Sequence, residues 1–556
     1  MAKRDRSLAE AMRQAALCYR RGEWLSAEGI CQYVLEASPD HLEALHLLAE
    51  ICFMQGRQAE ALAAYDRVLA LRPKDADAHY NRGVVLSTLG RHAAALESFD
   101  AGLALRPREA AALLNRGNAL QALGRHAEAV QGFDAALAVE PQNADARYNR
   151  GNALHALGRD AEALASYERA LALRPGHVEA LLNRGKVLAA LGRHAEAIES
   201  YDSALRHDPG RVDVHYNRGN ALRALERDAE AMASYDRALA LEPDHADAHW
   251  NRAWALLSLG DCERGWPEYE WRWKSTEWIP LPRRSSAARW LGDCDPAGRT
   301  IFLQAEQGAG DTLQFLRYVP LLAGRGANVV LELPRSLARL CAAYRDWARL
   351  VLEDEPVPPH DLQCAMASLP LAFRTTLETI PARVPYLAAD PALADAWKAR
   401  LGPPAGARRV GLAWAGSPRQ KSEPRRGIGL EPCLPLFEVP GLEWVSLQVG
   451  ERAADLARLP AGAVKDVSAQ LDDFAQTAAL VANLDLVITT DTSVAHLAGA
   501  MGKPLWILLM HAADWRWLRG RDDSPWYPGA RLFRQANPGD WAGVIARVKA
   551  QLVRSQ

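Results

Sequence analysis

One 34-residue stretch decides the architecture of the first half of this chain: YNRGNALHALGRDAEALASYERALALRPGHVEAL, residues 148–181. Its Asn-Arg-Gly triplet, or a close variant, recurs at the same 34-residue step, at Asn81, Asn115, Asn149, Asn183, Asn217 and Asn251. A proline keeps that step at Pro39, Pro73, Pro107, Pro141, Pro175, Pro209 and Pro243. Proline cannot continue a helix, because it lacks the N–H and its ring clashes with the preceding turn. The sequence therefore predicts helical hairpins stacked as a solenoid.

A glycine separates the two helices of each hairpin. It stands at Gly22, Gly56, Gly90, Gly124, Gly158, Gly192 and Gly260, and Glu226 replaces it once. Glycine relieves the strain of a helix-ending left-handed residue. Small residues such as Ala61 alternate with large ones such as Tyr65, so we expect neighbouring helices to interlock. These landmarks resemble those of tetratricopeptide-repeat (TPR) proteins over about residues 7–275.

The second half of the chain alternates strands with helices. Short β-branched or apolar runs read as buried strands: TIFLQAE (300–306), NVVLELP (328–334), VGLAWAG (410–416), LEWVSLQ (442–448) and LDLVITT (484–490). Helical patterns between them predict parallel sheets. A Pro/Gly/Ala segment near residues 402–408 divides these elements into two α/β lobes. The fold class predicted is thus an α-helical superhelix followed by two α/β lobes.

The composition is that of an ordinary globular protein of several domains. Of 556 residues, 49% are apolar and 24% are charged, and the formal net charge of -2 argues against a nucleic-acid-binding surface. The eight cysteines lack the close spacing of a zinc or redox site, so we expect reduced thiols. Neither a signal-peptide core nor a bilayer-spanning apolar stretch is recognised. The sequence predicts a cytoplasmic protein without a membrane span.

The strongest chemical signal is the segment LDLVITTDTSVAHLAGAMGKP, residues 484–504. A buried strand ends at Thr490, and then Asp491, Thr492 and Ser493 open a helix that carries His496. Free backbone amides at a helix N-terminus, with hydroxyls beside them, favour a phosphate ligand. The alternative is that Asp491 or Thr492 merely caps the helix.

This segment resembles the donor-binding motif of heptosyltransferase-like glycosyltransferases, which have two Rossmann-like lobes in the GT-B arrangement. Those enzymes show Asp-Thr-Gly followed by His, and here Ser493 replaces the glycine. Further similarity lies in QGAGDTLQFLRYVPLL (307–322) and DWRWLRGRDDSPWYPGARLFRQ (514–535). The resemblance implies residues 1–275 as the TPR superhelix, 276–299 as an interdomain segment, 300–402 as the N-terminal lobe and 403–556 as the donor-binding lobe.

The loop QGAGD, residues 307–311, follows the first strand of the first lobe. Glycines there could serve only a tight turn, and Asp311 could be another helix cap. The resemblance instead implies that Asp311 is the catalytic base and that Gly310 of the same Gly-Asp motif lies at the donor. Inverting transfer requires a group that removes the proton of the attacking hydroxyl.

Four basic residues cluster after the strand at residues 410–416: Arg419, Lys421, Arg425 and Arg426. Positioned cations stabilise a leaving nucleotide phosphate, although a solvated basic loop is the commoner arrangement. By resemblance, Lys421 and Arg426 contact the donor, and Glu451 contacts its sugar or is a surface glutamate. The resemblance also implies catalysis without a metal and without a cofactor other than a nucleotide-sugar co-substrate, whose base and sugar the motifs do not specify.

The triplet asparagines, Asn81 to Asn251, match by position the asparagine ladder of O-GlcNAc transferase, which grips the main chain of its acceptor. An amide both donates to a carbonyl and accepts from an N–H, so it binds extended backbone without demanding a sequence. Recent duplication of the repeat is the alternative explanation.

TPRs joined to such a transferase resemble bacterial protein glycosyltransferases, including flagellin-modifying ones. That resemblance implies sugar transfer from a nucleotide-sugar to Ser or Thr hydroxyls of a protein acceptor. Two alternatives stay open at this point: a lipid-linked or polysaccharide acceptor, with the repeats serving assembly, and a non-catalytic TPR scaffold.

Overall fold

The computed structural model describes residues 2–276, 285–403, 408–416, 426–460 and 462–555. The chain divides into two compact units, Met1–Ala221 and Leu222–Gln556. The second unit therefore contains the last helical hairpins together with both sheets. Arg419, Lys421 and Arg425, expected near the donor, lie outside the described residues.

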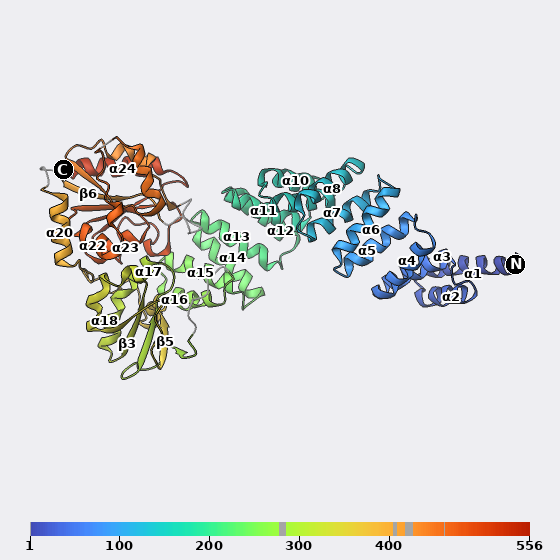
Figure 1. Ribbon diagram of the computed structural model, residues 1–556, viewed down its shortest axis with the longest axis horizontal. Coiled ribbons are helices and arrows are strands. Elements are labelled where there is room, and N and C mark those ends of the chain that lie inside the picture. The colour runs from blue at the N-terminus through green and yellow to red at the C-terminus, as the bar shows by residue number, and fades with distance from the viewer. Residues whose placement is uncertain (1, 277–284, 404–407, 417–425, 461, 556) are drawn as a thin grey trace. The chain divides into compact units, whose positions relative to one another are not determined.

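Helical hairpins build the first unit (Figure 1). They pair α1 (Ala2–Arg20) with α2 (Trp24–Ala37), α3 (Leu42–Met54) with α4 (Gln58–Leu71), α5 (Ala76–Thr88) with α6 (His92–Leu105), α7 (Ala110–Ala122) with α8 (His126–Val139), α9 (Ala144–Ala156) with α10 (Asp160–Leu173), and α11 (Val178–Ala190) with α12 (His194–His207). The series continues with α13 (Val212–Ala224), α14 (Asp228–Leu241), α15 (Ala246–Ser258), α16 (Cys262–Tyr269) and the 3-10 turn η1 (Glu270–Trp273). No helix in the described ranges is both long and apolar enough to cross a bilayer.

The turn glycines do what the repeat predicts. All seven have φ between +70° and +84°, the left-handed region that glycine enters without a steric penalty. Glu226 adopts the same conformation, with φ of 56°, although it carries a side chain. This residue is thus strained where the other turns are relaxed.

The hairpins interlock through the glycine of the Asn-Arg-Gly triplet. A Cβ added to Gly151 would lie 2.5 Å from Cε1 of Tyr167, and one added to Gly117 would lie 2.5 Å from Cε1 of Phe133. Both rings are fully buried. The triplet glycine therefore leaves room for the aromatic ring of the following helix, a role that the alternation of small and large residues did not reveal.

Two five-stranded parallel sheets occupy the second unit. The first has the order β1 (Ala288–Arg289), β5 (Leu362–Ala365), β2 (Thr300–Gln304), β3 (Asn328–Leu333), β4 (Ala348–Leu352). The second has the order β10 (Ala530–Arg534), β9 (Leu505–Leu509), β8 (Leu486–Thr490), β6 (Arg408–Ala413), β7 (Leu442–Ser446). The predicted fold class, a TPR superhelix followed by α/β lobes, is confirmed.

Helices connect these strands. They are α17 (Ala309–Phe315), α18 (Val319–Gly324), α19 (Leu369–Ala372), α20 (Pro391–Leu401), α22 (Phe474–Ala482), α23 (Ser493–Ala500) and α24 (Trp541–Arg554). Short 3-10 segments lie among them: η2 (Leu316–Tyr318), η3 (Arg335–Leu337), η4 (Leu340–Asp346), η5 (Met366–Ser368), η6 (Glu431–Leu436), η7 (Gly450–Arg458), η8 (Ser468–Gln470) and η9 (Trp515–Trp517).

Both faces of the second sheet are covered, as its unbroken apolar strands require. Val487 of β8 joins the apolar core formed with α22 and α23, whereas its neighbour Ile488 joins the core formed with Val544 and Ile545 of α24. Figure 1 shows α24 on the side of this sheet opposite to α22 and α23. Successive side chains of a strand point to opposite faces, so one strand serves both layers.

Each sheet has a point where the chain reverses its direction of strand addition. From β2 the chain adds β3 and β4 on one side and then β5 on the other; from β6 it adds β7 and then β8 on the opposite side. Ligands of such sheets bind outside the carboxyl ends of the strands at these switch points. The segments after β2 and β8 carry Asp311 and Asp491, respectively.

Candidate functional site

The two switch points meet, because the N-terminal parts of α17 and α23 pack against each other. Gly310 makes this approach possible. A Cβ at Gly310 would lie 2.8 Å from Cδ2 of His496 and 3.4 Å from Cα of Ser493. Residues that the sequence placed in separate lobes are thus neighbours in one site.

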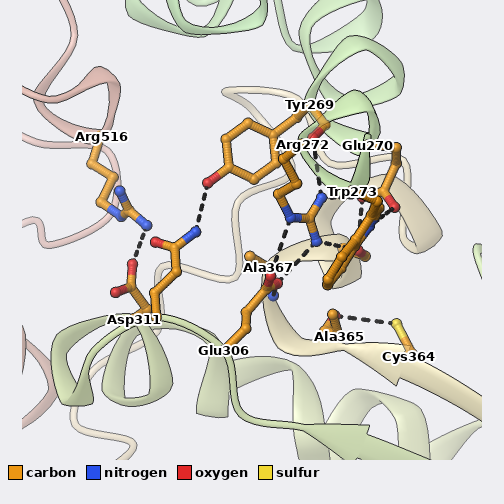
Figure 2. A network of polar contacts seen from close by, with 12 residues as sticks. Tyr269, Glu270, Arg272, Trp273, Glu306, Asp311, Cys364, Ala365, Ala367 and Arg516 are labelled. Carbon is orange, nitrogen blue, oxygen red and sulfur yellow. Dashed lines mark hydrogen bonds and ion pairs between the residues drawn. The ribbon is translucent and has the colours of Figure 1, made fainter. Parts of the chain in front are cut away.

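Asp311 uses both carboxylate oxygens in this structure. Its Oδ2 accepts a hydrogen bond of 3.0 Å from the backbone N–H of Gly308, as a residue in the first turn of a helix does. Its Oδ1 accepts from Nη2 of Arg516, which comes from the other lobe (Figure 2). Burial raises the pKa of Asp311 above its usual range, and the Arg516 charge offsets part of that rise. Helix capping therefore accounts for the contact of Oδ2 but not for the contact of Oδ1 with Arg516.

Arg516 connects the lobes and was missed at the level of sequence. Its Nη1 lies 2.9 Å from Oδ1 of Asp514, and its Nε donates to Oε1 of Gln314 at 2.6 Å. The side chain is only 6% exposed, so two carboxylates share one buried guanidinium. The sequence signal that could have indicated this ion pair is the spacing of Asp514 and Arg516, two residues apart in the DWRW segment.

The start of α23 carries no side-chain cap in the described part of the chain. Thr492 occupies the N-cap position by its backbone angles, yet within the described residues its side chain caps no N–H of the helix. Its hydroxyl lies instead 3.0 Å from Oγ1 of Thr489. Thr490 is fully buried, and its Oγ1 has no hydrogen-bond partner in the described part of the chain. Unsatisfied helix amides beside such a hydroxyl are the features that favour phosphate.

Asp491 is buried beside these amides. Its Oδ2 lies 3.9 Å from Nη1 of Arg426, which brings one of the expected basic residues to the site. Burial and the nearby charge of Asp514 raise the pKa of Asp491 to about 6. Glu451, in contrast, is exposed at the start of η7.

His496 is a buried, neutral imidazole. Its Nδ1 lies 2.9 Å from the hydroxyl of Tyr527, and its ring stacks on Trp517 with centroids 5.6 Å apart. Burial and the positive charges of Arg516, Arg317 and Arg426 hold its pKa well below the usual range. A neutral ring facing Gly310 orients hydrogen bonds rather than supplying charge.

The triplet asparagines bind residues of their own array. Asn149 Nδ2 donates to Oδ1 of Asn118 at 2.9 Å, and Asn183 Nδ2 donates to Tyr148 at 3.2 Å. Further contacts include Asn115 to Tyr80, Asn183 to Asn152, Asn217 to the carbonyl of Asp213, Asn251 to the carbonyl of Asp247 and to Arg223, and Asn81 to Tyr65. These amide groups therefore tie neighbouring repeats or turns together, and a bound peptide would have to share them.

The first unit contains a groove of about 1000 Å³. It is lined by the first helices of successive hairpins, with Met12 from α1, His46 from α3, Asn81 from α5 and Ala112 from α7. One member of the asparagine series thus faces a hollow large enough for a peptide segment.

Comparison with family models locates two kinds of module. A tetratricopeptide-repeat model matches residues 80–136, 114–178, 161–212, 182–241 and 216–265, and a second TPR-repeat model matches residues 49–90. The model described as glycosyltransferase family 9 (heptosyltransferase) matches residues 449–509. That match includes Glu451, Asp491 and His496 but does not extend to Asp311.

Individual relatives share parts of the chain. Protein FlbA of Caulobacter vibrioides is 31% identical over 326 residues, and the aligned region is 53% of this chain and 53% of that protein. The chain thus spans about half the length of this curated relative. The solved structure of YrrB, described as a TPR protein with an unusual peptide-binding site, is 29% identical and covers 34% of this chain and 96% of its own, with a TM-score of 0.31. A TPR protein from Parabacteroides merdae is 20% identical and covers 45% and 99%, with a TM-score of 0.35. The chain joins tetratricopeptide repeats to a heptosyltransferase-like glycosyltransferase domain.

Proposed function

We propose that this protein transfers a sugar from a nucleotide-sugar to Ser or Thr hydroxyls of a protein acceptor held by the repeats. The observation that carries the proposal is the meeting of two switch points, one presenting Asp311 and the other the N-terminus of α23, which has no side-chain cap among the described residues. A base for the acceptor and a phosphate site for the donor are the two requirements of an inverting transfer.

In the proposed reaction the acceptor oxygen attacks the anomeric carbon, and Asp311 takes the hydroxyl proton. The bond between that carbon and the donor phosphate breaks, and the leaving phosphate keeps the electron pair. The amides of α23 and the guanidinium of Arg426 stabilise the charge that develops there, without a metal ion. Asp311 already accepts from Gly308 and Arg516, so the acceptor hydroxyl binds a remaining lone pair of the carboxylate or displaces one of these partners.

Two observations support a protein acceptor in the cytoplasm. The groove of the first unit has the dimensions of a peptide site, and its lining includes Asn81. All eight cysteines are free thiols, the state that a reducing compartment maintains. A flagellin-like protein is an acceptor of the proposed class.

A donor screen tests this function directly. Purified protein is mixed with each of a set of nucleotide-sugars, and released nucleotide is measured with and without an unstructured Ser/Thr-rich protein. We expect one donor to be consumed faster with the protein and the sugar to appear on it by mass spectrometry. Transfer to lipid-linked sugars alone would refute the protein acceptor, and an absence of turnover with every donor would refute the enzyme.

Removing divalent metals should leave the transfer rate unchanged. Helix amides and arginine side chains bind the leaving phosphate in the proposed mechanism, so it has no step for a cation. The check is to measure initial rates in buffer treated with chelator and after magnesium or manganese is added back. Activity that disappears and returns with either metal would contradict the proposed mechanism.

Replacing Asn149, Asn183 and Asn217 together with Ala should weaken use of a protein acceptor about tenfold while sparing donor hydrolysis. The asparagine amides would no longer bind acceptor backbone, whereas helicity should not fall because Ala is the better helix former. Acceptor KM, donor hydrolysis and circular dichroism are the measurements.

Asn118 provides the control for this variant, because it accepts the hydrogen bond from Asn149 within the array. Asn118→Ala removes that contact but leaves the triplet asparagine in place. If Asn118→Ala raises acceptor KM as much as the triple variant does, the asparagines act by tying repeats together and do not grip the acceptor.

A further inference from the structure

Glu226 stands where the other hairpin turns have glycine, and its side chain contacts the transferase region. Nη1 of Arg519 donates to Oε1 of Glu226 at 2.8 Å. The residue keeps this contact although φ of 56° lies in the left-handed region, which is strained for a residue with a side chain. Glycine would remove the strain and the contact together.

Two further contacts fix Arg519 to the same hairpins. Its Nε donates to Oδ2 of Asp228 at 3.1 Å, and Asp228 is only 4% exposed. Its backbone N–H donates to the carbonyl of Ser258, at the end of α15, at 2.9 Å. The guanidinium is itself 12% exposed, so both carboxylates meet it away from bulk water.

Arg519 belongs to the segment that carries Arg516. Trp515, which directly precedes Arg516 in η9, packs edge-on against Trp266 with ring centroids 5.2 Å apart, and against Tyr269 at 6.1 Å. The last hairpin thus contacts the segment beside the residue that pairs with Asp311.

The same helices hold the loop of Asp311 from the other side (Figure 2). Nε2 of Gln307 donates to the hydroxyl of Tyr269 at 3.0 Å, and φ of Gln307 is 64°. Arg272 is fully buried and donates to both carboxylate oxygens of Glu306, at 2.9 and 3.1 Å. Glu306 and Gln307 directly precede the Gly308 turn that places Asp311.

We propose that residues 226–273 form a positioning brace for the loop of Asp311. Glu226 and Asp228 fix the segment of Arg519, and Tyr269 and Arg272 fix the loop at residues 306–311. Together these contacts hold Arg516 against Asp311. The last hairpins then position the catalytic residues, in addition to any role in binding the acceptor. This inference rests on the proposed function for its kinetic consequence, but the contacts themselves are testable without it.

Glu226→Gly in the full chain is the decisive variant. It relieves the strained turn, and Asp228 still gives Arg519 a counter-charge, so the fold should persist. We expect faster amide hydrogen exchange in residues 514–520 and unchanged nucleotide affinity. We also expect kcat to fall about tenfold, because small displacements of catalytic groups lower the rate. Arg519→Lys should give the same pattern, since an ammonium cannot reproduce the two-carboxylate contact.

Asp160→Asn is the matched control, because Asp160 holds the same position in another repeat as Asp228 and pairs with His155. It should leave exchange in residues 514–520 and kcat at parental values. Glu226→Gln, which retains an acceptor for Arg519, should recover most of the loss. Parental exchange in Glu226→Gly would overturn the brace. Faster exchange with parental kcat would overturn its role in catalysis. If the parent transfers no sugar, the proposed function fails while the exchange result still decides the brace.

Discussion

Asp311→Asn should bind the donor almost as the parent does and transfer sugar on the order of 10²- to 10⁴-fold more slowly. An amide oxygen still accepts from the Gly308 N–H at the position of Oδ2, so the turn is retained. The amide cannot take up the proton of the acceptor hydroxyl, so the loss falls on turnover. Single-turnover transfer, nucleotide binding by calorimetry and thermal melting on the same sample measure the three quantities.

Asp473 offers a control with the same local contacts. It caps α22 by accepting from the N–H of Gln476 at 2.9 Å, and it pairs with Arg339 at 2.9 Å. Asp473→Asn should cost stability of about 0.5–2 kcal/mol at most and leave the rate per folded molecule unchanged. A similar rate loss in both variants would mean that Asp311 is a helix cap and not a base.

The rate of the parent should also fall as the pH is lowered through the pKa of Asp311. Only the ionised carboxylate accepts a proton, and burial raises that pKa above the ordinary aspartate value of about 3.9. The acid limb of kcat/KM should therefore lie at higher pH than an exposed aspartate would give, and Asp311→Asn should abolish it.

Arg516→Met should lower the free energy of unfolding by about 3 kcal/mol, because it leaves the half-buried carboxylates of Asp311 and Asp514 without their counter-charge. Chemical denaturation at neutral pH measures this loss. Without the Arg516 charge the pKa of Asp311 would rise further in the folded state, so this carboxyl stabilises the fold when protonated, and the stabilisation is lost as the pH rises through that pKa. The variant should approach the parent at low pH and fall furthest below it at high pH.

Arg335→Met is the exposed counterpart. Arg335 pairs with Asp354, but its side chain is 65% exposed, so water and salt screen the pair. This variant should unfold at the same denaturant concentration as the parent. Equal losses in the two variants would show that the Arg516 pair is solvent-screened and does not join the lobes as described.

The repeat and the strongest strands were accessible from the sequence because they obey local rules. Proline and glycine at a constant step mark helix ends, whatever the helices pack against. The strand before Asp491, LVITT, is buried at all five positions, as expected for a parallel sheet covered on both faces. The predicted helix start that follows it is also present, at Ser493.

The rest depended on contacts that no local pattern encodes. The two residues of β1 pair with β5 although they lie in a segment interpreted only as interdomain packing. Strand β9 was also missed, although its apolar run, LWILL, follows Gly502 and Pro504 and shows the same local signals as the strands that were predicted. Arg516 was missed because its ion-pair partner, Asp311, is 205 residues away in the chain.

The position of Glu226 has a consequence for how the protein can diverge. A duplication or loss of a whole 34-residue unit before residue 222 changes the length of the array, since each repeat contacts mainly its neighbours. Every contact of the brace lies after that point. Under the proposed function, gene lineages can therefore lengthen or shorten the acceptor-binding surface by unequal recombination while the residues around Asp311 are inherited intact, which would separate the evolution of acceptor range from that of chemistry.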